Sequence, residues 1–162
     1  MTTQVKNLLL RKTISVKAPP SHVFDVFVNR FDTWWPRTHH IGKTPSFTTK
    51  LEPRQGGRWY EISEDGQECD WGRVLVWEPP NRLVLTWDIT ASWQYDPNVA
   101  NEVEVLFHAE GDGQTRVELE HRKLENYGND AMTMFGIFDS DDGWTSILRS
   151  LASQAAATAR GH

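Results

Sequence analysis

The chain has 162 residues, of which 38% are hydrophobic and 24% charged, a composition typical of one globular domain and unlike that of disordered or fibrous proteins. Its 17 Lys and Arg against 22 Asp and Glu give a net charge of -5, and no basic run interrupts the sequence, which excludes nucleic acid as a partner. No apolar stretch approaches the roughly 20 residues of a membrane span, which excludes membrane insertion.

The compartment follows from the cysteine content and the N-terminus. The single Cys69 cannot form an internal disulfide, and the first residues, MTTQVKNLLLRK, lack the apolar core of a secretory signal. We therefore expect a cytoplasmic protein.

The first elements are a strand and two short helices. Alternating apolar and polar residues from Asn7 to Ala18 predict a strand that ends at Pro19-Pro20. Near-helical apolar spacing over residues 21–28 predicts a short helix, and a second one is expected from residue 29 through Trp34 and Trp35 to Pro36.

Six further strands are expected in the middle of the chain. Turn residues such as Glu64-Asp65-Gly66 and Gly111-Asp112-Gly113 separate them. The predicted strands are Thr44 to Leu51, Gly57 to Ser63, Glu68 to Trp77, Leu83 to Thr90, Glu102 to Glu110 and Thr115 to Arg122. Because hairpins join most of them, one antiparallel sheet is predicted.

A long amphipathic helix is predicted at the C-terminus. Apolar residues recur at helical spacing at Trp144, Ile147, Leu148, Leu151 and Ala155. The acidic stretch at 139–142 before them is expected to cap this helix and to favour its dipole. The sequence does not decide whether residues 125–136 form a loop, a lid or a short helix, and we expect a mobile connection.

The order of these elements resembles the helix-grip superfamily that contains the START and polyketide-cyclase domains (SRPBCC). The segments VKAPPSHVFDVF, LEPRQGGRWYE, DWGRVLVWEPPNRLVLTW, VEVLFHAEGDGQTRVELEH and DDGWTSILRSL are similar to the branch named after the activator of the heat-shock chaperone ATPase, in its small bacterial stand-alone form. The resemblance covers about residues 8–157 and implies a single domain over residues 1–162.

The fold class implied is α+β. A curved antiparallel sheet of six to seven strands is expected to wrap around the long C-terminal helix, with two short helices after the first strand. The superfamily also implies a pocket between sheet and helix for an apolar small molecule, although one scaffold hosts many functions.

Motifs for nucleotide, zinc-protease, hydrolase or thiol-redox chemistry do not occur in the sequence, so no cofactor is expected. His39-His40 lacks the spaced partners of a metal site, and we expect a solvated loop or a pair at the pocket mouth and no metal.

Two residues are candidates for proton transfer. Alternation places His121 on the covered face of the last strand, either as a hydrogen-bonded core histidine or as a ligand contact or general base. If Glu61 also faces inward, the two are candidates for an acid-base pair. The register of Glu61 and of Arg73 is left open; Arg73 is expected on the surface and Asp70 at a turn or rim.

Eight Trp in one small domain indicate either dense packing or an aromatic pocket. The function predicted is binding of a hydrophobic or aromatic small molecule by a monomer or homodimer. The alternatives are a cofactor-independent cyclase or hydrolase, and regulation of a chaperone ATPase. The residues expected to bind the ligand are Trp34, Trp35, Trp59, Trp87, Phe107, Leu119, His121, Trp144 and Leu148.

Overall fold

Seven antiparallel strands form one sheet in the order β1-β7-β6-β5-β4-β3-β2. The structure is a computed structural model that describes residues 7–159, so residues 1–6, part of the segment inspected for a secretory signal, lie outside the described residues. The strands are β1 (Leu10–Val16), β2 (Phe47–Leu51), β3 (Arg58–Ser63), β4 (Glu68–Glu78), β5 (Arg82–Trp87), β6 (Asn101–Ala109) and β7 (Thr115–Arg122).

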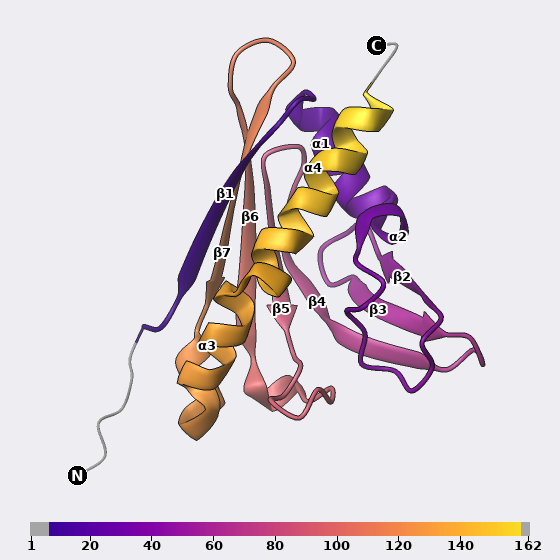
Figure 1. Cartoon of the computed structure of the whole chain (residues 1–162), viewed down its shortest axis with the longest axis vertical. Helices are drawn as coiled ribbons and strands as arrows, with labels where there is room; N and C mark the ends of the chain where they lie inside the picture. Colours follow the sequence, from indigo (N-terminus) through magenta and orange to yellow (C-terminus); the bar gives the residue numbers. More distant parts are fainter. Residues whose placement is uncertain (1–6, 160–162) are drawn as a thin grey trace.

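Helices cover one side of this curved sheet. The short helices α1 (Pro20–Asn29) and α2 (Phe31–Trp34) follow β1, while α3 (Ala131–Asp139) and α4 (Ser146–Thr158) follow β7. Figure 1 shows α4 running along the sheet with α1 and α2 beside its C-terminal half. Shorter turns are η1 (Pro97–Val99), η2 (Leu124–Asp130) and η3 (Asp141–Thr145). The predicted helix-grip arrangement is confirmed.

Strands β6 and β7 show why the sequence forms this sheet. Val105 pairs with Leu119 and Phe107 with Val117, and these side chains are buried under the helices. The alternate side chains face the other side of the sheet, where Arg122 forms ion pairs with Glu102, Glu104 and Glu120 at 3.0, 3.0 and 3.2 Å. Side chains therefore alternate along β6 and β7 between a face that the helices cover and a face that solvent reaches.

A β-bulge in β4 resolves the register that the sequence left open. The pairing with β3 shifts between Trp59 and Tyr60, and as a result both Trp71 and Val74 are buried. A bulge changes which face a strand presents, so neither regular alternation holds along the whole of β4. Arg73, which was expected on the surface, is partly exposed, with 41% of its side chain accessible, and it forms an ion pair with Asp70 at 3.4 Å.

Gly72 is required at this bulge because two strands approach it closely. A Cβ atom at this position would lie 2.0 Å from the Thr86 carbonyl oxygen and 2.7 Å from the Trp59 indole nitrogen. Only glycine therefore permits the local packing.

The segment expected as a mobile connection is helical. The 3-10 turn η2 leads directly into α3, whose Met134 and Phe138 are buried at i and i+4. The Tyr127 hydroxyl donates to the Ile89 carbonyl at 2.6 Å, and burial raises the pKa of Tyr127. Apolar contacts with the sheet thus outweigh the turn signals of the sequence.

Residues 140–145, which include η3, separate α3 from α4, and we call this segment the α3–α4 break. Gly143 has non-helical dihedral angles, and a Cβ atom there would lie 2.3 Å from the Phe138 carbonyl oxygen. Of the stretch expected to cap α4, Asp139 ends α3 and residues 140–142 lie in this break, and no side chain among them caps α4. Ser140 instead donates to the Ile137 carbonyl at 2.7 Å. Among residues 7–159, no helix is both long and apolar enough to cross a membrane.

Candidate functional site

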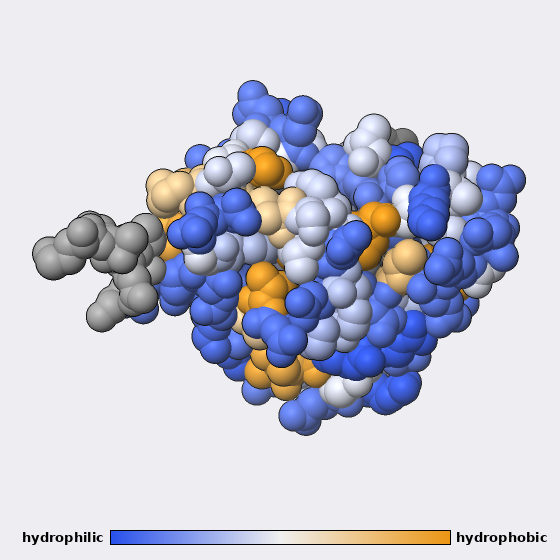
Figure 2. Space-filling model, turned by 90° about the horizontal axis from the view of Figure 1, so that it is seen from below, coloured by the Kyte–Doolittle hydropathy of each residue, from blue (hydrophilic) through white to orange (hydrophobic). Residues whose placement is uncertain are grey.

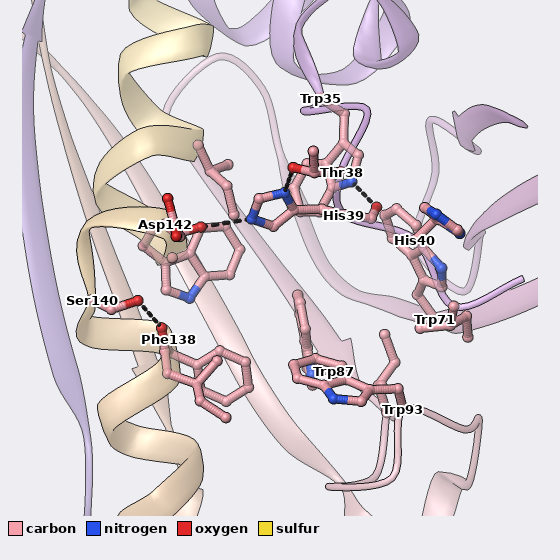
Figure 3. Close-up of a pocket in the computed structure, with 16 residues that line it drawn as sticks. Trp35, Thr38, His39, His40, Trp71, Trp87, Trp93, Phe138, Ser140 and Asp142 are labelled. Carbon is pink, nitrogen blue, oxygen red and sulfur yellow. Dashed lines mark hydrogen bonds between the residues drawn. The ribbon is translucent and has the colours of Figure 1, made fainter. Parts of the chain in front are cut away.

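A cavity of about 560 Å³ lies between the sheet and the α3–α4 break. Six aromatic side chains line it: Trp35, Trp71, Trp87, Trp93, Phe138 and Trp144. In Figure 3, Phe138 lies on the helical side of the cavity and Trp71 on the opposite side. The remaining walls are aliphatic (Ile41, Ile89, Ile137 and Ile147), and polar groups come from Thr38, His39, His40, Ser140 and Asp142.

The aromatic rings of the wall pack mostly edge to face. Trp87 lies 5.3 Å from Phe138 and 5.7 Å from Trp144 between ring centroids, and Trp35 lies 5.1 Å from Trp71. Such geometry is favourable for aromatic pairs. Together with the pair of Trp35 and Trp144 at 6.2 Å, these contacts connect five of the six rings of the wall, all except Trp93.

Three indole N–H groups of the wall bond to protein acceptors. Trp35 donates to the His39 carbonyl at 2.8 Å, Trp71 to the Glu61 carboxyl at 2.9 Å, and Trp144 to His121 Nδ1 at 3.0 Å. Because these donors are satisfied within the protein, the three rings contribute mainly apolar carbon to the cavity.

Glu61 is completely buried and anchors the loop that closes one side of the cavity. One of its oxygens accepts from the Ile41 N–H at 2.6 Å and from Trp71, and the other accepts from the Gly42 N–H at 3.0 Å. A Cβ atom on Gly42 would lie 2.9 Å from the Glu61 oxygen, so glycine permits this close approach. Glu61 acts on the cavity through the residues that it positions.

His121 is also completely buried, and both of its nitrogens are engaged. Nε2 donates to Asn101 Oδ1 at 2.5 Å, while Nδ1 accepts from Trp144. Burial lowers the pKa of His121 to about 3, which keeps the ring neutral at physiological pH. In the described part of the chain no hydrogen bond joins His121 to Glu61, so the structure does not bring the two together as a pair.

His39 connects the loop after α2 to the helix break. Its Nε2 lies 2.6 Å from the Asp142 carbonyl oxygen, which can only accept, and its Nδ1 lies 2.9 Å from the Thr38 hydroxyl. His39 therefore carries its proton on Nε2 in the neutral ring. Figure 3 shows this bridge between the two sides of the cavity.

His40 differs from its neighbour in having a ring nitrogen available. Its Nδ1 lies 3.0 Å from the Gly42 carbonyl oxygen and donates to it, which leaves Nε2 with a lone pair in the neutral ring. Across residues 7–159 no hydrogen bond engages this Nε2, and no group of three or more His, Cys, Asp or Glu side chains is placed to hold a metal ion.

Three of the nine residues expected to bind a ligand line the cavity: Trp35, Trp87 and Trp144. The other six lie in the core behind or beside it: Trp34, Trp59, Phe107, Leu119, His121 and Leu148. Phe107, for example, packs against Phe24 with a centroid distance of 5.1 Å, and Trp34 donates to the Val26 carbonyl in α1.

The cavity also contains aromatic residues that the sequence did not single out. Trp71 lies at the bulge of β4, Trp93 lies in the turn after β5, and Phe138 lies near the end of α3, just beyond the segment 125–136 that was expected as a mobile connection. For Trp71 and Trp93, the high tryptophan content was the only signal in the sequence.

Comparisons with known proteins agree with this fold. Residues 17–156 match the family described as Activator of Hsp90 ATPase homolog 1-like protein. A search of curated protein sequences gives no match.

Solved structures provide closer comparisons. The chain is 40% identical to an anthrahydroquino-gamma-pyrone synthase, Txn09, solved in complex with SUM, with a TM-score of 0.65 over 90% of this chain and 95% of that one. It is 29% identical to the self-sacrificing resistance protein CalC from Micromonospora echinospora, with a TM-score of 0.67 over 95% and 97% of the two chains. NE0264 from Nitrosomonas europaea, at 15% identity and a TM-score of 0.64 over 93% and 96%, shares the fold. The chain belongs to the family of Activator of Hsp90 ATPase homolog 1-like proteins.

Proposed function

We propose that the protein binds a planar polycyclic aromatic molecule in the cavity between the sheet and the α3–α4 break. The observation that carries this proposal is the wall of six aromatic rings, three of which have their N–H groups satisfied within the protein. Flat rings offer faces and edges to a flat ligand, and the cavity of about 560 Å³ lies within the usual size of small-molecule sites.

The polar groups of the cavity favour a ligand with oxygen substituents. Thr38, His39, His40, Ser140 and Asp142 all belong to the two segments that meet near the His39 bridge. A hydroxylated ring system can place its apolar body against the aromatic wall and its oxygens at this polar side. The name of the 40% identical synthase, which refers to an anthrahydroquinone, supports the same ligand class.

Isothermal titration calorimetry with emodin, a three-ring hydroxylated anthraquinone, tests the proposal. Trp93→Ala removes one ring from the wall at a position that is 41% exposed, so the fold is expected to tolerate the change. We expect emodin to bind the unmodified protein and the variant to bind roughly five- to tenfold more weakly.

Leu75→Ala is the matched control, because Leu75 is 39% exposed and lies away from the cavity. It should leave the affinity unchanged. Absence of emodin binding, or equal weakening by both substitutions, would refute the proposal.

A second candidate function is cofactor-independent ring closure on such a ligand. The unengaged Nε2 of His40 on the cavity wall favours it, as does the similarity to a synthase. In this reaction His40 takes the proton of a hydroxyl group as its oxygen bonds to a carbonyl carbon, and the proton returns to the former carbonyl oxygen. Loss of water then completes a pyrone ring without an oxidant.

Conversion of 2′-hydroxydibenzoylmethane to flavone, followed by absorbance, tests this second function. We expect the unmodified protein to accelerate the reaction and His40→Gln to lower kcat by roughly 100-fold. His108→Gln is the control, since His108 lies on the opposite face of the sheet beside Glu118. A rate equal to that without protein would exclude this activity for the tested substrate class.

A further inference from the structure

A second cavity of about 570 Å³ adjoins the aromatic one. The two share Ile41 and Trp93 among their lining residues. Figure 3 shows Trp93 across the first cavity from the α3–α4 break, on the same side as Trp71 and His40. A ligand that passes Trp93 therefore extends from one cavity into the other.

The second cavity differs from the first in chemistry. Its side chains include two amides, Gln67 and Gln94, and two aromatic rings, Trp93 and Tyr95. Within residues 7–159 no hydrogen bond engages either side-chain amide, and both residues are exposed. Each amide offers donors and an acceptor to a ligand.

The charges of this cavity balance. The lining contains two cationic side chains, Lys43 and Arg58, and two carboxylates, Glu68 and Asp70. Arg58 is already paired with Asp70 at 2.5 Å and with Glu68 at 2.9 Å. An anionic substituent would compete with these carboxylates for Arg58. A neutral substituent with several hydroxyl groups fits better, because carboxylates and amides both accept from hydroxyls.

Backbone hydrogen bonds order the turn after β5, whose two aromatic side chains face solvent. Trp93 is 41% and Tyr95 38% exposed. The backbone N–H of Trp93 donates to the Thr90 carbonyl at 2.9 Å, and the backbone N–H of Thr90 donates to the Gln94 carbonyl at 2.8 Å. Tyr95 forms a β-bridge with Ile89.

The backbone conformation of this turn is unusual at Trp93. Trp93 adopts φ 62, a conformation that is uncommon for a bulky residue and that persists mainly at functional positions. A solvent-facing aromatic ring beside free amides is suited to the C–H face of a pyranose, whose hydroxyls the neighbouring polar groups then bind.

We propose that the second cavity binds a neutral sugar attached to the aromatic ligand, so that the preferred ligand is a glycoside. This inference rests on the proposed function, because the aromatic part of the glycoside occupies the first cavity. Trp93 lies at the junction and contacts both parts.

Calorimetry with emodin and with emodin-8-O-β-D-glucoside tests the inference. We expect the glucoside to bind the unmodified protein at least tenfold more tightly than emodin. In the double variant Gln67→Leu and Gln94→Leu this advantage should disappear, while the affinity for emodin stays within twofold. Both positions are exposed and neither lines the first cavity, so the variant is expected to fold.

The outcomes separate the two proposals. If emodin binds and the glucoside binds no more tightly, the second cavity is not a sugar site and the proposed function stands. If the advantage of the glucoside survives the double substitution, the sugar lies elsewhere and the inference is wrong. If neither compound binds, the proposed function and this inference both fail.

Discussion

Glu61 and His121 each accept the indole N–H of a tryptophan in the cavity wall. Both side chains are completely buried, and both find further partners: Glu61 in the Ile41 and Gly42 amides, and His121 in Asn101. Buried polar groups of this kind fix the orientation of what they bind. At the scale of single residues, the aromatic wall is held from behind by these two side chains.

Glu61→Gln tests this anchoring role with an almost isosteric change. The Gln side chain presents an NH₂ group where the carboxyl group accepts, so at least one buried donor loses its partner. We expect the free energy of unfolding in urea to fall by about 2 kcal/mol. Glu64→Gln is the control because Glu64 is exposed at the end of the same hairpin; equal unfolding free energies for the two variants would contradict the role.

His121 is expected to make stability depend on pH. Its pKa is lowered to about 3 in the folded protein, whereas an unfolded chain has a value near the ordinary 6.5, so the unfolded state binds the proton more readily as pH falls. Stability is then fully present above about pH 6.5 and is lost between about pH 6.5 and 3.

Between pH 7 and 5 this loss amounts to about 2 kcal/mol. Urea unfolding at both values should show it in the unmodified protein, while His121→Gln should lack this part of the dependence, whatever its absolute stability. Equal pH dependence in the two proteins would mean that His121 titrates normally in the fold.

The sequence identified both residues but not their partners. Alternation along β7 placed His121 on the covered face, yet its acceptor Asn101 is 20 positions away on β6. The sequence predicted that Glu61 faces inward only for one of two possible strand registers. Its partners are backbone amides in the loop at 41–42, where the sequence shows no periodic pattern. Partners that meet through backbone amides and distant side chains cannot be derived from periodicity.

At the scale of elements, two irregularities shape the cavity: the bulge in β4 and the break between α3 and α4. The bulge turns Trp71 inward, and the break places Gly143 and Trp144 on the cavity wall directly after Phe138 and Ser140. Regular elements were predictable because periods of 2 and 3.6 residues mark a buried face. Irregular ones were not, since they break those periods.

Gly143→Ala tests the importance of the break. The added methyl group would meet the Phe138 carbonyl oxygen at 2.3 Å, so we expect the unfolding free energy to fall by about 1–3 kcal/mol and emodin binding to weaken. Gly136→Ala is the matched control within α3, where a Cβ atom meets nothing within 4 Å. It should stabilise the protein by about 0.5–1 kcal/mol. Equal effects of both substitutions would show that the break has no special geometry.

At the scale of the whole molecule, aromatic and polar side chains are exposed at one end of the protein, where α3 and the turn after β5 lie. Figure 2 views the molecule from this end and shows orange apolar residues set among blue hydrophilic ones. Met132 and Ile137 of α3 and Trp93 of the turn are among the exposed large hydrophobic residues. Isolated apolar residues on a surface are ordinary, but Trp93 and Ile137 also line the cavity, which makes this end the expected entrance.

Ligand binding at one such site should stabilise the entire fold. Emodin at 100 times its dissociation constant is expected to add about 2.7 kcal/mol to the unfolding free energy, which corresponds to a rise in Tm of roughly 5–10 °C for a domain of this size. A thermal-shift series with increasing emodin checks this. A Tm that does not change with concentration would contradict it.

The tryptophan indole signals in an ¹H–¹⁵N NMR spectrum test the central claim most directly, because the eight tryptophans divide into two sets. Trp35, Trp71, Trp87, Trp93 and Trp144 line the cavity, whereas Trp34, Trp59 and Trp77 do not. Titration with emodin should produce its largest shifts in the first set. Largest shifts in the second set, or no shifts at all, would contradict an aromatic ligand site between the sheet and the α3–α4 break.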